Sequence, residues 1–490
     1  MSSRAVLAVA SECAPLVKTG GLADVVGALP AALEPHGWTI RTLIPGYRRV
    51  LSALKRPRVV LDLPDLLGTP ARLLAARVGD LDLLILDAPA LFDRDGSPYL
   101  NAGGNDWSDN DLRFAALSKT AALIAGGALT GWQPEVVHLH DWQAGLVPVY
   151  MAAAGVTVPS VMTIHNIAFH GLTAASRMTA LELPAAGFTL DGFEYWGHIS
   201  ALKAGLTGAT AITTVSPTYA HELTTPEFGM GLEGVIATRR HDLQGILNGI
   251  DTQTWNPASD QAIRSFASPG GKAANTRALR AEFGLDKSRG PLAVVISRLS
   301  DQKGLDLLLQ ALPALTGRGG QLALLGSGDR RLENAWLSAG AANPGMVAVR
   351  IGYDETLSHR MYAGADAVLV PSRFEPCGLT QLYGLRYGAL PVVARTGGLA
   401  DTVIHANAAA LAVGCATGIT HRPNCVPSLE NALAQLCDLW RDRPTFTRLQ
   451  RNAMKHPVGW GASAPVYARL YARLAEQHAD EHADEHEDPA

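Results

Sequence analysis

The chain has few cysteines and no long apolar run. Its five cysteines are an odd number without paired spacing, which argues against a disulfide framework or a zinc knuckle and favours a reducing compartment. No stretch approaches the roughly 18 to 20 apolar residues of a membrane span, and the run Ala5–Ala10 is shorter than a signal-peptide core. We therefore expect a cytoplasmic protein with no membrane partner.

Charge is also scarce. Charged residues make up 18% of the chain, and the formal net charge is −4, which argues against a nucleic-acid partner. The chain is nevertheless long, with 490 residues of which 47% are hydrophobic. One hydrophobic core rarely serves so long a chain, so we expect two domains of roughly 200 residues or more.

Short apolar runs, each followed by a loop with glycine or proline and then by a segment of helical period, recur along the chain. This alternation is typical of α/β doubly wound domains. We expect strands at Ala5–Ala10, Leu81–Leu86, Glu135–Leu139, Val161–Ile164, Leu292–Ile296, Gln321–Leu325 and Ala367–Val370.

An internal near-repeat accompanies this pattern. The nine residues that begin at Lys18 return at Arg395 with seven of nine positions identical. Two loop-to-helix turns that resemble each other by chance are one explanation. Two related nucleotide-type domains are the other, which we favour.

The domain boundary is predicted near Asn248-Gly-Ile-Asp251, where a turn-rich segment begins. The predicted parts are a first domain over residues 1–250, a second over 251–455, a terminal helix within 456–476 and an acidic, disordered tail over 477–490. Helical spacing would place His478, His482 and His486 on one face as a metal site, but a solvated tail is the favoured interpretation.

Two loops carry cations next to a predicted helix start. Lys18 precedes Gly20 and Gly21 after the first predicted strand, and glycines let backbone N–H groups approach an anion. Arg298 and Lys303 follow the strand Leu292–Ile296 in the same way. A leaving diphosphate needs its growing negative charge neutralised, and paired cations at a helix N-terminus supply this without a metal. A tight turn with solvated basic residues is the alternative.

A carboxylate follows another predicted strand. Glu375 comes after Ala367–Val370 and just before a helix, and Gly378 permits close approach of the backbone. Such a carboxylate suits sugar hydroxyls beside phosphate-binding N–H groups, although an acid in the first turn of a helix is also ordinary capping.

Polar residues also end the strands that precede Asp141 and Asn166, where open α/β sheets bind ligands. His138, His140 and Asp141 could be read as metal ligands, but strand geometry points Asp141 away from the two histidines. Three Asp-x-Asp pairs have the contexts of a strand, a turn and a helix start. We therefore expect no metal site.

Together these segments resemble the bacterial glycogen synthases and plant starch synthases, retaining glucosyltransferases with two Rossmann-like domains (the GT-B architecture). The resemblance runs from about Val6 to about Leu474. It rests on motifs in the family's order: Lys18-Thr-Gly-Gly-Leu, His138-Leu-His-Asp-Trp, Thr163-Ile-His-Asn, Leu247-Asn-Gly-Ile-Asp, Ser297-Arg-Leu-Ser-Asp-Gln-Lys-Gly-Leu, Ser372-Arg-Phe-Glu-Pro-Cys-Gly-Leu-Thr-Gln and Arg395-Thr-Gly-Gly-Leu.

The resemblance implies a role for each site residue. Lys18, Arg298 and Lys303 hold the diphosphate, with Gly20 and Gly21 giving the backbone room. The donor glucose contacts Glu375, His165 and Asn248, and sugar and phosphate meet the backbone of Cys377, Gly378, Leu379 and Thr380. Asp141 and Asn166 line the cleft, and the terminal helix crosses back to the first domain.

The resemblance further implies transfer of glucose from ADP-glucose to the 4-hydroxyl of a glycogen or α-1,4-glucan end, with retention, release of ADP and no cofactor. Substitution of Glu375 or Lys303 by alanine should then lower turnover strongly with a nearly unchanged melting temperature. The alternatives are a UDP-glucose-using synthase, a non-catalytic nucleotide-sugar sensor and a glucan phosphorylase that carries pyridoxal.

Overall fold

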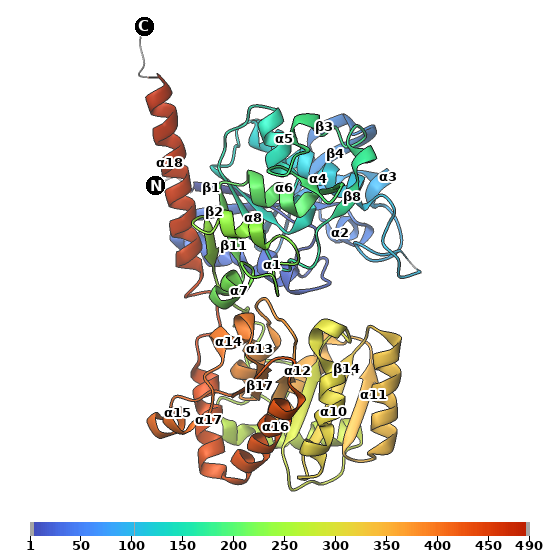
Figure 1. Cartoon of the computed structure of the whole chain (residues 1–490), viewed down its shortest axis with the longest axis vertical. Helices are drawn as coiled ribbons and strands as arrows, with labels where there is room; N and C mark the ends of the chain where they lie inside the picture. The colour runs from blue at the N-terminus through green and yellow to red at the C-terminus, as the bar shows by residue number, and fades with distance from the viewer. Residues whose placement is uncertain (1–3, 102, 487–490) are drawn as a thin grey trace. The chain divides into compact units, whose positions relative to one another are not determined.

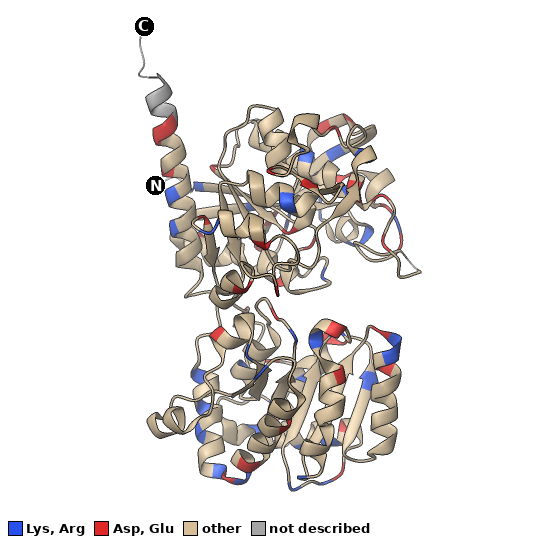
Figure 2. Ribbon diagram, viewed as in Figure 1, with Lys and Arg blue, Asp and Glu red and all other residues tan. Residues whose placement is uncertain are grey.

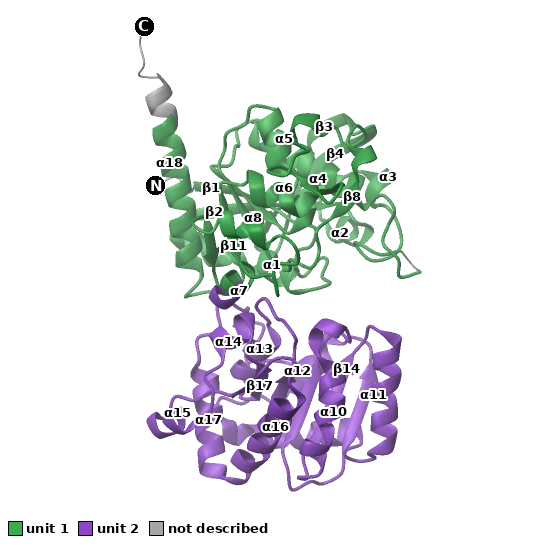
Figure 3. Ribbon diagram, viewed as in Figure 1, with its two compact units in different colours: residues 1–215, 220–247, 460–490 green, residues 216–219, 248–459 purple. Residues whose placement is uncertain are grey.

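The computed structural model describes residues 4–101 and 103–486, with side chains up to residue 481. The chain folds into two compact units, drawn in green and purple in Figure 3. Unit 1 holds residues up to 215, residues 220–247 and the chain from 460 onward, while unit 2 holds residues 216–219 and 248–459. The long segment of unit 2 thus begins at residue 248, slightly before the expected boundary at 250 and 251.

Unit 1 is built on a nine-stranded sheet in the order β12-β11-β7-β6-β1-β2-β5-β4-β3. The pairs β3·β4 and β4·β5 are antiparallel and the other neighbours are parallel. The strands are β1 (Arg4–Val9), β2 (Trp38–Pro45), β3 (Arg58–Leu66), β4 (Thr69–Val78), β5 (Leu81–Asp87), β6 (Val136–His140), β7 (Ser160–Ile164), β11 (Ala211–Thr214) and β12 (Leu243–Gly245).

Helices connect these strands (Figure 1). They include α1 (Gly21–Leu33), α2 (Arg48–Ala53), α3 (Pro89–Phe92), α4 (Asn110–Ala125), α5 (Val147–Ala153), α6 (Ala201–Gly208), α7 (Pro217–Glu222) and α8 (Glu233–Thr238). A small antiparallel sheet of β8 (Leu172–Ala174), β10 (His198–Ser200) and β9 (Glu194–Tyr195) is separate from the main sheet.

Unit 2 contains a six-stranded parallel sheet in the order β15-β14-β13-β16-β17-β18. Its strands are β13 (Leu292–Ile296), β14 (Gln321–Gly326), β15 (Val347–Ile351), β16 (Ala367–Val370), β17 (Leu390–Ala394) and β18 (Ile419–His421). Its helices are α9 (Ala273–Phe283), α10 (Leu305–Thr316), α11 (Arg330–Ala342), α12 (Glu355–Gly364), α13 (Thr380–Tyr387), α14 (Gly397–Thr402), α15 (Ala408–Val413), α16 (Val426–Arg441) and α17 (Arg443–Lys455).

The sheet of unit 2 and the parallel strands of unit 1 follow the doubly wound order in which the third, second, first, fourth, fifth and sixth strands lie side by side. In unit 1 this order is extended by β12 at one edge and by the antiparallel β4 and β3 at the other. Strands such as β6, β7 and β13 are buried along their whole length, because parallel strands in this fold are covered on both faces and are rich in Val, Ile and Leu. All seven predicted strands are present, and the predicted doubly wound fold is confirmed.

The C-terminal helix α18 (Ala464–His486) belongs to unit 1, beside β1 and β2 (Figure 1). Tyr467, Leu470, Tyr471 and Leu474 join a buried cluster with Val6 and Trp38. The expected disordered tail needs correction, because the helix continues past residue 476 to His486 and no glycine or proline follows Pro465 in it. The side chains of His482 and His486 and the whole of residues 487–490 lie outside the described residues.

The internal repeat occupies different places in the two units. Lys18 follows β1, the first parallel strand of unit 1, whereas Arg395 follows β17, the fifth strand of unit 2. Equivalent positions in duplicated domains would follow equivalent strands. The preferred interpretation of the repeat as a trace of related domains is therefore wrong, and two similar loop-to-helix turns explain it.

Charged residues of both signs occur in each unit (Figure 2), in agreement with the small net charge. Among the described residues, none of the helices combines the length and the hydropathy that a membrane span requires.

Candidate active site

The strand order of each sheet reverses at a switch point, between β1 and β6 in unit 1 and between β13 and β16 in unit 2. Loops that leave neighbouring strands in opposite directions at such a point open a crevice, where doubly wound domains bind ligands. The residues predicted from the sequence fall into two groups there. The unit 1 half-site is Lys18, Gly20, Gly21, Asp141, His165 and Asn166. The unit 2 half-site is Asn248, Arg298, Lys303, Glu375, Cys377, Gly378, Leu379 and Thr380.

In unit 1 the loop after β1 leads into an uncapped helix. Helix α1 begins at Gly21, and its N-cap residue, Gly20, has no side chain that could cap the first N–H groups. A Cβ added at Gly20 would meet no protein atom within 4 Å, so the protein leaves open space there. An uncapped helix N-terminus with free space in front of it suits an anion. Nζ of Lys18 lies 2.8 Å from Asp24, on the first turn of the same helix.

A buried glutamate fixes this loop. Glu12, which is 3% exposed, accepts hydrogen bonds from the backbone N–H of Thr19 and from its hydroxyl, the latter at 2.6 Å. The hydroxyl of Tyr99 also donates to Glu12 and lies 2.7 Å from Ser11 Oγ. The residue between Lys18 and Gly20 is thereby held in place by a charge-assisted hydrogen bond.

Asp141 joins the ends of β6 and β7. Its Oδ1 accepts hydrogen bonds from the backbone N–H groups of His165, at 2.6 Å, and Asn166, at 3.3 Å. The backbone φ of Asp141 is +56°, a conformation that few non-glycine residues adopt. Burial raises the pKa of Asp141 to about 7, even though the two N–H groups favour the carboxylate.

His165 ends a chain of buried imidazoles. Its Nε2 lies 2.9 Å from Nδ1 of His140, and the rings of His140 and His138 stack with centroids 4.1 Å apart. His138 in turn contacts the hydroxyls of Thr163, at 2.6 Å, and of Tyr471 on α18, at 2.7 Å. Burial lowers the pKa of His138 and of His165 to about 3 and also lowers the pKa of His140, so all three rings are neutral at pH 7.

In unit 2 the loop after β13 presents two cations. Arg298 is exposed, and its guanidinium has no ion pair within the described part of the chain. Gly304 has φ +61°, and a Cβ there would lie 2.2 Å from the carbonyl oxygen of Pro371. Glycine at 304 therefore lets the loop after β13 lie against the loop after β16. Lys303 reaches the second loop as a consequence.

Lys303 and Glu375 form a buried ion pair. Nζ of Lys303 lies 2.8 Å and 2.6 Å from the two carboxylate oxygens of Glu375, and the two side chains are 17% and 8% exposed. The hydroxyl of Ser372 donates to Glu375 at 2.7 Å. These partners give the Glu375 carboxylate a fixed orientation.

The backbone after Glu375 turns sharply into α13. Gly378 has φ +72°, and no side chain caps the helix, which begins at Thr380. The backbone N–H of Asn248 donates to the buried thiol of Cys377, whose pKa burial raises to about 12. The thiol therefore stays protonated at pH 7 and is a poor nucleophile. Cβ atoms at Gly397 or Gly398 would collide with the backbone of Glu375 or Cys377, so the second copy of the internal repeat supports this turn.

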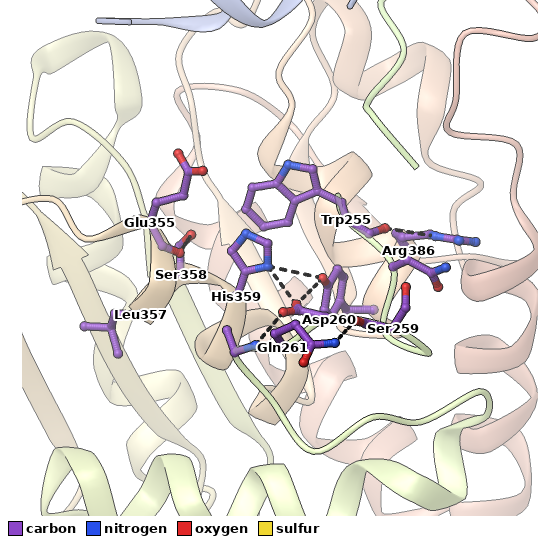
Figure 4. Close-up of polar contacts among 12 residues, drawn as sticks. Trp255, Ser259, Asp260, Gln261, Glu355, Leu357, Ser358, His359 and Arg386 are labelled. Carbon is purple, nitrogen blue, oxygen red and sulfur yellow. Dashed lines mark hydrogen bonds and ion pairs between the residues drawn. The ribbon is translucent and has the colours of Figure 1, made fainter. Parts of the chain in front are cut away.

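The far end of α13 is anchored by an aromatic and acidic cluster (Figure 4). Tyr387, at the end of the helix, donates to Asp260 at 2.6 Å, and Nδ1 of His359 lies 2.7 Å from the same carboxylate. The rings of His359 and Trp255 stack with centroids 3.8 Å apart, and Arg386 donates to the Trp255 carbonyl at 3.1 Å. These contacts fix the helix whose first turn carries Thr380.

Residues 5–238 match the family of the starch synthase catalytic domain, and residues 277–455 match the glycosyl transferases group 1. The glycogen synthase of Paracoccus denitrificans is 59% identical over 466 residues, which cover 95% of this chain and 98% of that protein. The glycogen synthase of a Jannaschia species is 58% identical over 465 residues, with 95% and 98% covered. The chain belongs to the glycogen synthase family.

Solved structures agree with this membership. The catalytic domain of starch synthase IV from Arabidopsis thaliana, bound to ADP and acarbose, has a TM-score of 0.86 and 30% identity, with 97% of this chain and 100% of that chain covered. A sucrose-phosphate synthase from Thermosynechococcus elongatus shares the fold, with a TM-score of 0.61 and 17% identity over 96% and 99% of the two chains. The predicted glycosyltransferase fold and the predicted resemblance are confirmed.

Sequence reasoning missed several residues that shape the site of this glycogen synthase family member. Glu12 and Ser372 have no motif of their own, and His140 was considered as a metal ligand rather than as a partner of His165. The hydroxyl of Tyr362 on α12 bonds with Thr380. A polar residue next to a glycine-containing loop is a weak signal of a site residue, because its hydrogen-bond partner is set by the fold rather than by spacing in the sequence.

The structure offers no support for a metal centre. Among the described residues, no three His, Cys, Asp or Glu side chains are grouped to hold an ion. Members of the three Asp-x-Asp pairs instead form ion pairs with arginines: Asp82 with Arg41, Asp93 and Asp95 with Arg48, Asp109 with Arg94, and Asp111 with Arg177.

Four aromatic side chains of unit 1 are of a kind that stacks on sugars, those of Tyr99, Trp107, Trp142 and Trp196. Trp142 packs edge-to-face on Phe114, Trp107 lies under Arg94, and Tyr99 is engaged with Glu12. Trp196, by contrast, is 83% exposed at the turn between β9 and β10. Its exposed indole makes it the strongest of the four candidates.

Proposed function

We propose that this chain transfers glucose from ADP-glucose to the non-reducing end of an α-1,4-glucan with retention of configuration and releases ADP. The observation that carries the proposal is the placement of cations and uncapped helix N-termini at the switch points of both sheets. A nucleoside diphosphate is the ligand that such crevices suit. The ADP bound to the related starch synthase IV structure supports the choice of nucleotide.

The unit 2 half-site would act on the leaving group. Arg298, Lys303 and the first N–H groups of α13 would bind the diphosphate and stabilise the negative charge that grows on it as the glycosidic bond breaks. Glu375 would accept hydrogen bonds from hydroxyls of the donor glucose. Its ion pair with Lys303 supports this proposal, because the pair would bring sugar and phosphate recognition side by side. Asn248, next to Cys377, would complete the contacts with the sugar.

The unit 1 half-site would supply the remaining contacts. Lys18 and the open N-terminus of α1, with Gly20 and Gly21, would add to diphosphate binding. His165 would contact the glucose as a neutral group, and Asp141 and Asn166 would shape the pocket around it. Trp196 would bind the incoming glucan by stacking.

Retention without a covalent intermediate fits these groups. Retaining hydrolases place two carboxyl groups about 5 Å apart, one as nucleophile and one as acid. Here Glu375 is engaged by Lys303 and Ser372, and the Cys377 thiol is protonated. We therefore propose that the acceptor hydroxyl attacks on the face that the diphosphate leaves, and that a phosphate oxygen takes its proton.

The decisive experiment is incorporation of labelled glucose into glycogen by the purified protein. ADP-glucose and UDP-glucose are supplied in parallel, each with and without EDTA, and the new linkage is identified by the NMR signal of its anomeric proton. We expect EDTA-insensitive formation of α-1,4 linkages from ADP-glucose. Preference for UDP-glucose, loss of activity in EDTA or a β-linked product would each contradict one part of the proposal.

A further inference from the structure

His165 of the unit 1 half-site touches another imidazole rather than a carboxylate or a carbonyl. Nδ1 of His140 and Nε2 of His165 are 2.9 Å apart. A neutral imidazole carries one N–H and one bare nitrogen, so one ring must donate across this contact and the other must accept. The direction of the bond therefore sets which nitrogen of His165 carries its proton.

The remaining nitrogen of each ring decides the direction. Nε2 of His140 is buried and has no hydrogen-bond partner in the described part of the chain, and the His140 residue is 1% exposed. If His140 accepted, this nitrogen would be a buried N–H without an acceptor. If His140 donates through Nδ1, its Nε2 is instead a buried nitrogen without a proton. Buried N–H groups without partners are rarer in proteins than unsatisfied acceptors, so donation from His140 is favoured.

We propose that His140 is a positioning residue that donates its Nδ1–H to His165 and thereby holds the proton of His165 on Nδ1. That nitrogen has no partner among the residues described. His165 then presents a hydrogen-bond donor to the bound sugar and cannot act as a base there. This inference rests on the proposed contact between His165 and the donor glucose, and it deepens that contact by specifying its polarity.

The neighbours of His140 make its own orientation rigid. Its ring lies against His138, which is held from both sides by the hydroxyls of Thr163 and Tyr471. The backbone N–H of His165 is fixed separately by Asp141. The distance between the two ring nitrogens is thus set by β6, β7 and α18 before any ligand binds.

The direct test is the protonation state of the His165 ring. Protein labelled with [15N]histidine gives two-bond 1H–15N correlations whose nitrogen shifts distinguish a protonated from a bare ring nitrogen. The signals are assigned by their loss in His165→Gln and in His140→Asn. We expect His165 to be protonated on Nδ1 and His140 on Nδ1. A His165 signal with the proton on Nε2 would overturn the proposal.

Kinetics of matched variants test the consequence. The side-chain amide of His140→Asn places an N–H near the position of Nδ1, whereas His140→Leu removes the donor. We expect His140→Leu to lower kcat/KM for ADP-glucose about 10- to 100-fold, and His140→Asn to restore most of it. Tyr150→Phe loses a buried hydrogen bond to the Leu181 carbonyl in the same unit and none to the three histidines, so it should leave kcat/KM unchanged and serves as the control for a merely structural effect.

The outcomes separate this proposal from the proposed function. Equal activity of His140→Leu and the unaltered protein, together with an inactive His165→Gln, would refute positioning by His140. Full activity of His165→Gln together with an Nδ1-protonated His165 would support the tautomer and refute the contact between His165 and the donor.

Discussion

The Lys303–Glu375 pair allows its structural role to be separated from its chemical role. Nζ of Lys303 lies 2.6 Å from the nearer oxygen of Glu375, and at an effective dielectric constant of about 20 such charges attract by about 6 kcal/mol. Desolvation of both partners offsets much of this attraction, so we expect a net coupling of about 2–3 kcal/mol in a double-mutant cycle. The isosteric substitutions Lys303→Met and Glu375→Gln remove the charges.

Each single substitution leaves the other group buried without its counter-charge, and it should destabilise unit 2 by about 3 kcal/mol. Combining the two removes both charges, so the double variant should be more stable than the sum of the single effects predicts. Stability is measured by urea unfolding with tryptophan fluorescence, which reports on Trp255, Trp336 and Trp440 of unit 2. The sequence alone predicted nearly unchanged melting temperatures for such variants, and the burial of the pair changes that expectation.

Activity should behave in the opposite way. Lys303 and Glu375 are proposed to act on different atoms of the donor, so each single variant should lose about 100-fold or more in kcat, and the double variant should regain nothing. Glucose incorporation is measured under conditions in which every variant is folded. If the double variant regained activity along with stability, the pair would be a structural element, and the chemical roles proposed for both residues would be refuted.

Three further predictions follow from the geometry. Burial raises the pKa of Asp141 to about 7 from 3.8, so ionisation of this carboxyl favours the unfolded chain. The free energy of unfolding should therefore fall as the pH rises from about 4 to 7. Asp141→Asn should abolish this fall in urea unfolding, and an unaltered pH dependence would contradict the assignment. Lys18→Met should raise the KM for ADP-glucose about tenfold. Asp24→Asn removes the counter-charge of the ion pair but keeps Lys18, and it should not raise the KM. Equal effects would exclude phosphate binding by Lys18. Trp196→Ala should weaken glycogen binding about three- to tenfold in affinity electrophoresis, with unchanged stability. Leu190 is similarly exposed, and Leu190→Ala should bind glycogen normally. Equal glycogen affinities of the two variants would exclude stacking by Trp196.

The sequence predicted the fold because the fold depends on local patterns. Strands such as β13 and β16 are uninterrupted runs of Val, Ile, Leu and Ala, and such runs between loops with glycine predict buried parallel strands. Motif order also placed the charged site residues, since loops after parallel strands meet at one edge of a sheet. Lys303 and Glu375 are 72 positions apart in the sequence, yet their loops are neighbours.

What the sequence could not predict are partnerships set by packing. Spacing along one strand relates His138 to His140, but the hydrogen bond between His140 and His165 joins the ends of two strands and depends on the register of β6 and β7. The same limit applies to Glu12 and to the contact of His138 with Tyr471, 333 positions away. The interpretation of the internal repeat as a trace of related domains was wrong for a related reason. Similar loop-to-helix turns can follow strands that hold different positions in their sheets.

The unit 1 half-site contains neutral histidines, whereas the unit 2 half-site contains an ion pair. This difference bears on which group takes the proton of the acceptor hydroxyl. In unit 1 burial keeps His138, His140 and His165 neutral, so the proposed contact of His165 with the donor glucose would be made by an uncharged ring. In unit 2 Lys303 and Glu375 form a buried ion pair, and Arg298 and the N-terminus of α13 belong to the same half-site. A proton released by the acceptor hydroxyl would be costly to place on His165, since burial disfavours an imidazolium there. The departing phosphate becomes more basic as its bond to the sugar breaks. This distribution of charge therefore favours the phosphate as the group that takes the proton, as we propose.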